Sequence, residues 1–125
     1  MYRLYAYADS SDLAAHEAIL VRAFSEFMAS WSVVGTLFTN KKAPLTEGQE
    51  FADWNLGLRV NAPALTREDI EQLLSFLAQL SRQVNLPFVL GTWRERTVGT
   101  TDLCSIDRHV PDGAAGLILE GANAP

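Results

Sequence analysis

A chain of 125 residues, 48% of them hydrophobic and 20% charged, is long enough to bury a core and too apolar to stay disordered. It therefore predicts one globular unit that needs no disulfide or metal in order to fold. The formal net charge of −5 at pH 7 argues against a general affinity for phosphate backbones. Cys104 is the only cysteine, which excludes an intrachain disulfide and a cysteine-rich zinc site.

The N-terminal residues, MYRLYAYADSSD, lack the basic start, the apolar run and the small-residue cleavage site of a signal peptide. No apolar run approaches the roughly 20 residues that a membrane-spanning helix needs. Together with the single cysteine, these features predict a cytoplasmic protein that does not enter a membrane.

Residues 2–8 alternate in polarity, as a β-strand does when one of its faces is buried. The face predicted to be buried carries Leu4, Ala6 and Ala8. The opposite face carries Arg3, Tyr5 and Tyr7. A helix follows, which begins at one of the possible N-caps Asp9, Ser10 and Ser11 and ends near Trp31. Its apolar stripe consists of Leu13, Leu20, Phe24, Phe27 and Trp31.

Residues 32–40 are rich in β-branched and aromatic side chains and predict a second strand. The segment 41–52 contains proline and glycine and is long for a hairpin loop, which makes it a candidate wall of a site. A third strand is predicted to follow and to bury Trp54, Leu56, Leu58 and Val60. Its other face carries Asn55, Gly57 and Arg59.

The clearest element is an amphipathic helix within residues 65–87, LTREDIEQLLSFLAQLSRQVNLP. Thr66 is its predicted N-cap and forms a variant of the capping box with Asp69, while Leu65 and Ile70 form a hydrophobic staple. Its apolar stripe consists of Ile70, Leu73, Leu74, Leu77, Leu80 and Val84. Because proline disfavours helix in the residue before it, the helix should end before Pro87.

Residues 88–96 predict a fourth strand, although the pattern does not decide which of its faces is buried. From residue 98 onward, glycine, threonine and aspartate interrupt every pattern. A short fifth strand is possible at 103–106, and 116–120 reads either as a strand or as a short docked segment. We therefore divide the chain into an α+β domain over residues 1–97 and an irregular C-terminal extension over 98–125, packed on the same domain or trailing from it.

The order strand, helix, strand, strand, helix, strand is that of a ferredoxin-like βαββαβ sandwich. Right-handed crossovers would place both helices on one face of a four-stranded antiparallel sheet, with the first and third strands as central neighbours. Many unrelated functions share this fold, so it does not identify an activity.

The sheet face left open by the helices is the predicted binding surface, and it carries Arg3, Tyr5, Tyr7, Asn55 and Arg59. Either Thr92 and Arg94 or Trp93 and Glu95 would join them, depending on the fourth strand. Tyrosine and arginine are enriched at protein–protein contacts, because both combine apolar area with a polar end. Stacking of single-stranded RNA on such aromatic residues is disfavoured, because the third strand lacks a basic-glycine-aromatic run and the chain is acidic.

Residues capable of chemistry are few and match no motif strongly. His16 could act as a general base, but a lone histidine near a helix start more often makes an ordinary hydrogen bond. The densest group of potential ligands or catalytic residues comprises Asp102, Cys104, Asp107, His109 and Asp112. The segment that carries this group is rich in aspartate and contains glycine, which is typical of turns. No phosphate-loop, dinucleotide or nucleophile-elbow motif occurs in the sequence. We therefore predict neither a metal nor a cofactor.

These observations favour a small non-catalytic binding or regulatory protein, of the inhibitor or immunity type, over an enzyme. Its partner would be another protein or a second copy of itself as a homodimer, and neither a nucleic acid nor a membrane. The alternative is a dimeric α+β-barrel enzyme or small-molecule-binding protein. Its pocket would lie between sheet and helices, with a lining of Trp31, Trp54, Phe38 and His16. A cavity of about 300 Å³ or more there would favour the alternative.

Overall fold

A computed structural model describes residues 2–8, 15–41, 54–93 and 100–122 of the chain. For residues 38–41, 54–55, 93 and 100–101 it describes the backbone alone. The elements in chain order are β1 (Tyr2–Ala8), α1 (Glu17–Ser30), β2 (Gly35–Lys41), β3 (Trp54–Ala62), α2 (Arg67–Val84), β4 (Phe88–Trp93), β5 (Thr100–Ile106) and α3 (Ala114–Ala122).

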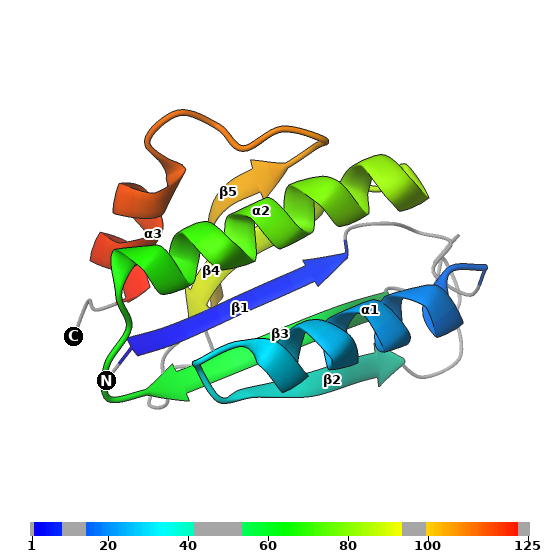
Figure 1. Cartoon of the computed structure of the whole chain (residues 1–125), viewed down its shortest axis with the longest axis horizontal. Coiled ribbons are helices and arrows are strands. Elements are labelled where there is room, and N and C mark those ends of the chain that lie inside the picture. The colour runs from blue at the N-terminus through cyan, green and yellow to red at the C-terminus, as the bar shows by residue number, and fades with distance from the viewer. Residues whose placement is uncertain (1, 9–14, 42–53, 94–99, 123–125) are drawn as a thin grey trace, which may run out of the picture.

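The strands form one antiparallel sheet in the order β2-β3-β1-β4-β5. The central strand β1 pairs with β3 on one side, where Leu4 lies opposite Val60, and with β4 on the other, where Ala6 lies opposite Leu90. All four of these side chains are fully buried and belong to a core that also includes residues of the three helices. The helices therefore cover one face of the sheet (Figure 1).

The α+β class predicted from the sequence is confirmed, but the four-stranded sheet with an irregular extension is not. Residues 100–106 pair with β4 and add a fifth strand, and residues 114–122 form a helix where the pattern at 116–120 suggested a strand or a docked segment. The physical reason is pairing: β5 satisfies backbone groups of β4 that would otherwise form an open edge. Helix α3 then packs its apolar face into the same core, where Ile118 is fully buried.

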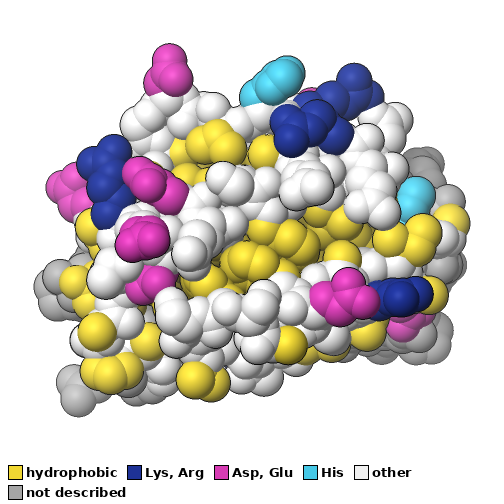
Figure 2. Space-filling model, viewed as in Figure 1, with side chains coloured by type: hydrophobic (Ala, Val, Ile, Leu, Met, Phe, Trp, Pro, Cys, Tyr) yellow, Lys and Arg dark blue, Asp and Glu magenta, His cyan; other side chains and the backbone are white. Residues whose placement is uncertain are grey.

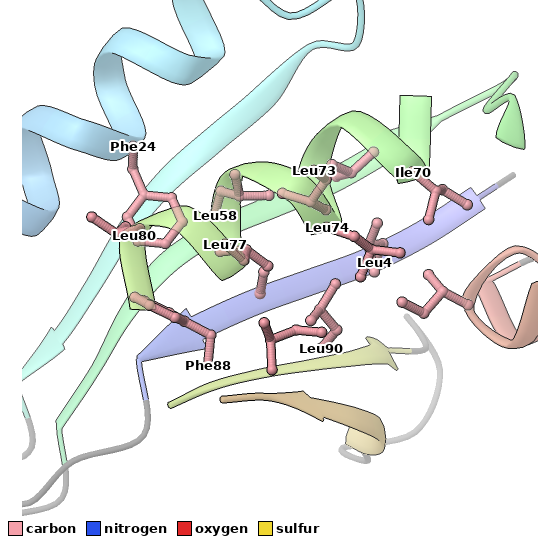
Figure 3. Close-up of a cluster of buried hydrophobic side chains, with 14 of the residues drawn as sticks. Leu4, Phe24, Leu58, Ile70, Leu73, Leu74, Leu77, Leu80, Phe88 and Leu90 are labelled. Carbon is pink, nitrogen blue, oxygen red and sulfur yellow. The ribbon is translucent and has the colours of Figure 1, made fainter. Parts of the chain in front are cut away.

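Helix α2 follows its sequence signals closely. The Thr66 hydroxyl accepts a hydrogen bond from the Asp69 amide at 3.1 Å, and the Asp69 carboxylate accepts one from the Thr66 amide at 3.0 Å, so the predicted capping box is present. Leu65 and Ile70 are both buried, as a hydrophobic staple requires. Every residue of the predicted stripe is buried, and Figure 3 shows the part of it from Ile70 to Leu80 above the sheet. The helix ends at Asn85, which takes a left-handed conformation with φ 59°.

Helix α1 differs from its prediction at the start. The helix begins at Glu17, and the N-cap residue His16 makes no side-chain capping hydrogen bond. The predicted caps at residues 9–11, and Leu13 of the predicted stripe, lie outside the described residues. Leu20 and Phe24 are fully buried, which confirms the centre of the stripe.

Two polar residues of α2 attach neighbouring segments to the helix. At its start, the backbone carbonyl of Asp69 accepts a hydrogen bond from the Trp31 indole at 3.2 Å, and its carboxylate accepts one from the Ser32 hydroxyl at 2.6 Å. Near its end, the buried Ser81 hydroxyl donates to the Leu86 carbonyl at 2.6 Å and accepts from the Arg108 amide at 2.9 Å. The end of α1 and the segment after β5 are thus both attached to α2.

Leu77 is fully buried in the centre of the α2 stripe. Leu77→Ala should lower the free energy of unfolding by about 2–5 kcal/mol, because it leaves a cavity that the sheet cannot fill. Urea denaturation measures the change, and Gln79→Ala on the exposed side of the same helix is the control, with an expected change within about 0.5 kcal/mol. A loss below about 1 kcal/mol for Leu77→Ala would contradict the central position of this residue.

The Ser32 hydroxyl, followed by the Thr66 amide, holds the pKa of the Asp69 carboxyl below its ordinary value of 3.8 by hydrogen bonding to the charged form. A lowered pKa in the folded state adds stability above the unfolded pKa and loses it as the pH falls through the folded pKa. Ser32→Ala should therefore raise the pKa of Asp69 and reduce stability at neutral pH more than in acid. Titration of the carboxyl carbon by NMR measures this shift.

The matched control for that titration is Ser30→Ala. The Ser30 hydroxyl donates to the Phe27 carbonyl and makes no described bond to Asp69. An Asp69 pKa that stayed the same in Ser32→Ala, or rose equally in Ser30→Ala, would show that the Ser32 bond is not its main cause.

Candidate functional site

The sheet face opposite the helices is the first candidate surface. Within the part of the chain that the structure describes, all three helices contribute to the core on the other side. One row of residues crosses four strands of this open face in register. It runs Arg59 in β3, Tyr5 in β1, Gly91 in β4 and Asp102 in β5.

The Tyr5 side chain joins strands that are not neighbours. Its hydroxyl donates a hydrogen bond of 2.5 Å to the Asp102 carboxylate, although β4 lies between β1 and β5. The ring must therefore cross β4 where Gly91 has no side chain, which is a common use of glycine inside a strand. Only 5% of Tyr5 is exposed, and the Tyr7 ring lies beside it at a centroid distance of 5.6 Å.

The predicted binding residues differ in how accessible they are. Arg59 is exposed, Arg3 and Tyr7 are half-buried, and Tyr5 is buried. Asn55 belongs to β3, but its side chain lies outside what the structure describes. The register thus brings Arg59 and Tyr5 together as expected, and it places a buried tyrosine beside an exposed arginine.

Asp102 is the member of this surface that sequence reasoning placed elsewhere. It was grouped with possible catalytic residues of the tail, because the pairing of β5 with β4 has no local signature. Gly91 lies opposite Tyr5, so alternation puts Thr92 on the helix side and not on the open face. The Gly91–Asp102 pair then follows a register shift next to Leu90, which the sequence does not reveal.

The potential catalytic cluster does not converge. Cys104 lies opposite Leu90 and packs against the core, on the face away from Asp102, and burial raises the pKa of its thiol. A protonated, half-buried thiol is a poor nucleophile. Asp107 and His109 form an isolated β-bridge. Among the described residues, no three histidine, cysteine or acidic side chains are placed to hold a metal ion.

A second surface lies on the outer side of the helices, where two adjoining hollows share Phe27, Phe76 and Gln79. Their volumes are about 330 Å³ and about 490 Å³. We call the two together the helix trough. A separate hollow of about 400 Å³ lies beside Val34 and Asp69, where α1 leads into β2. The helix trough opens on the outer side of the helices, whereas the alternative hypothesis expects a pocket between helices and sheet. The hollow beside Val34 also has Asn61 and Ala62 of β3 in its lining.

Comparisons of the chain with protein-family models, with curated proteins and with solved structures find no match. No helix in the described segments is both long enough and apolar enough to cross a bilayer. The two surfaces themselves are therefore the basis for a functional proposal.

The Tyr5–Asp102 bond can be measured with a double-mutant cycle. Tyr5→Phe and Asp102→Ala should each destabilise the protein, with a coupling energy of about 0.5–1.5 kcal/mol, because either change breaks the same bond. Thermal or urea denaturation of both single variants and the double variant measures the coupling.

The neighbouring Tyr7 supplies the matched control for that cycle. Tyr7→Phe combined with Asp102→Ala should be additive, because the Asp102 carboxylate accepts from Tyr5. Additive effects of Tyr5→Phe and Asp102→Ala would instead contradict the bond across β4.

Proposed function

We propose that this chain is a small non-catalytic binding or regulatory protein, of the inhibitor or immunity type, which acts through protein–protein contacts at its open sheet face. The observation that carries the proposal is the Arg59–Tyr5–Gly91–Asp102 row. It places an exposed arginine beside a tyrosine that is held rigidly by Asp102. An ordered aromatic cluster next to an arginine is a common interface anchor, because little entropy is lost on binding. Tyr5 is itself buried, so the accessible groups of this anchor are Arg59 and the half-buried Tyr7.

The size of the face supports this function. Five strands about 4.8 Å apart and about seven residues long form a surface of roughly 24 by 23 Å, or about 550 Å². A standard interface buries about 800 Å² on each partner, so the face could supply most of one. We include in the proposal a ferredoxin-like unit made of β1 to β4 with α1 and α2, which β5 and α3 extend.

The net charge of −5 bears on the partner. An acidic protein attracts a cationic partner over long distances and speeds their encounter, which suits an inhibitor of a basic enzyme. A second copy of the chain is the other partner that the proposal allows. The same proposal includes a cytoplasmic location. It also includes an action that involves no cofactor, no nucleic acid and no membrane.

The dimeric α+β-barrel alternative has less support. Trp31, one of its predicted pocket residues, is buried and donates its indole hydrogen bond to Asp69. The helix trough lies on the outer side of the helices, and the lining of the hollow beside Val34 includes none of the predicted pocket residues. The side chains of Phe38 and Trp54 lie outside what the structure describes, so this alternative stays a prediction.

Arg59→Glu is the sharpest test, because it reverses the exposed charge of the row and leaves the buried Tyr5 in place. Association with the partner, or self-association, should weaken about tenfold or more while the thermal midpoint stays nearly unchanged. Light scattering reports self-association, and a pull-down from the native organism followed by titration reports a partner.

Arg22→Glu is the matched control, because Arg22 is equally cationic and exposed but lies on α1, where it pairs with Glu26 at 3.1 Å. It should leave association through the sheet face intact. The proposal would be wrong if Arg59→Glu had no effect on association, or if both arginine variants had the same effect.

A further inference from the structure

The floor of the helix trough is a pair of stacked phenylalanines. The rings of Phe27 in α1 and Phe76 in α2 are nearly parallel, with an interplanar angle of 8° and a centroid distance of 4.3 Å. Both residues are half-buried, so part of this apolar area faces outward. Figure 2 shows hydrophobic side chains gathered between the two helices on this side of the molecule.

This pair is held from below and cannot move freely. The Phe76 ring meets the fully buried Phe24 edge-on at 5.5 Å, and Phe24 in turn meets Phe88 at 6.0 Å. On the other side, Phe27 lies 5.0 Å from the Trp31 ring. An apolar anchor that is already ordered loses little entropy on binding, which is the property expected of a docking surface.

The shape of the trough is elongated. Its lining residues on α2 extend from Glu68 to Gln83 and repeat at helical spacing. At 1.5 Å per residue this is a length of about 22 Å, equal to a helix of about 15 residues. Such a groove, with one apolar floor and polar walls, is the form that receives the apolar side of an amphipathic helix.

The charge of the trough is one-sided. Its charged lining residues are Glu26, Glu68 and Glu71. Asp69, also in the first turn of α2, lines the separate hollow beside Val34 and not the trough. The Arg22–Glu26 and Arg67–Glu71 pairs are exposed and contribute little to stability, so a basic partner could exchange with them. The other end of the trough carries Gln79 and Gln83 with the single carboxylate of Glu26, so two of the three lining carboxylates lie at the Glu68 and Glu71 end.

We propose that the helix trough binds an amphipathic helix of another protein, with an apolar face over Phe27 and Phe76 and a lysine- or arginine-rich end beside Glu68 and Glu71. A second copy of this chain fits less well, because it would bring a further net charge of −5 to the acidic end. The site is separate from the open sheet face, since the two lie on opposite sides of the molecule.

The probe is a synthetic amphipathic peptide of about 15 residues, with leucine and phenylalanine on one face and three lysines at one end. A matched peptide has glutamates in place of the lysines. Fluorescence anisotropy with the full chain at low salt should give about tenfold or more tighter binding of the lysine peptide, and the difference should shrink as salt is added. A nitroxide at the lysine end should broaden NMR signals of residues 68–72 more than those of 79–83.

Protein variants test the site itself. Glu68→Gln combined with Glu71→Gln should remove most of the preference for the lysine peptide, and both positions are exposed, so folding should be kept. Glu120→Gln, an exposed glutamate on α3, should leave the preference unchanged. Arg59→Glu should bind the lysine peptide as the unaltered chain does, which separates this test from that of the sheet face.

Three results would overturn the proposal. They are equal affinity for the two peptides, no binding at millimolar peptide, and loss of preference in Glu120→Gln as large as in the Glu68 and Glu71 variant. Sedimentation equilibrium could give a fourth result that overturns the proposal. If the chain forms a dimer, and if the dimer becomes stronger when Glu68 and Glu71 are replaced by glutamine, the dimer forms through the trough. A second copy of the chain would then be the true occupant.

Discussion

The burial of one face of α2 against the central strand β1 is the contact on which the rest of the structure depends. The stripe from Ile70 to Val84 shares one buried core with Leu4, Ala6 and Ala8, and both lateral neighbours of β1 extend the same core. The two ends of α2 then attach other parts of the chain. Asp69 binds Trp31 and Ser32 at the end of α1, and Ser81 binds Leu86 and Arg108 before and after the last two strands. Ser81 is buried, and a buried polar group that is satisfied in this way favours one arrangement over its competitors.

The position of α2 also explains why the molecule has two distinct surfaces. Because the helices cover one side of the sheet, the other side carries the Arg59–Tyr5–Gly91–Asp102 row, where a hydrogen bond holds an aromatic ring flat across a glycine. Because α1 and α2 meet through stacked rings, the outer side of the helices carries a trough with an ordered apolar floor. One surface combines tyrosine with arginine, and the other combines phenylalanine with glutamate. They would therefore select partners of different charge and shape.

The residues capable of catalysis do not form a site in the described part of the chain. Asp102 and Cys104 are two positions apart in β5 and would share a face in a regular strand, but the register shift next to Leu90 places them on opposite faces of the sheet. Burial keeps the Cys104 thiol protonated. The proposed binding function would reside in surface shape and charge and not in a few converging groups.

The elements that could be predicted from the sequence are those whose signals are local. The capping box of α2, its apolar stripe and the alternation of β1 and β3 each depend on residues within a few positions of one another, so they can be recognised without a fold. Only the tertiary structure decided the burial of Tyr5, its bond to Asp102 across 97 positions of sequence, the pairing of β5 and the helical state of α3. These features depend on which segments pack together. That outcome is set by the shared core, and no short stretch of sequence contains it.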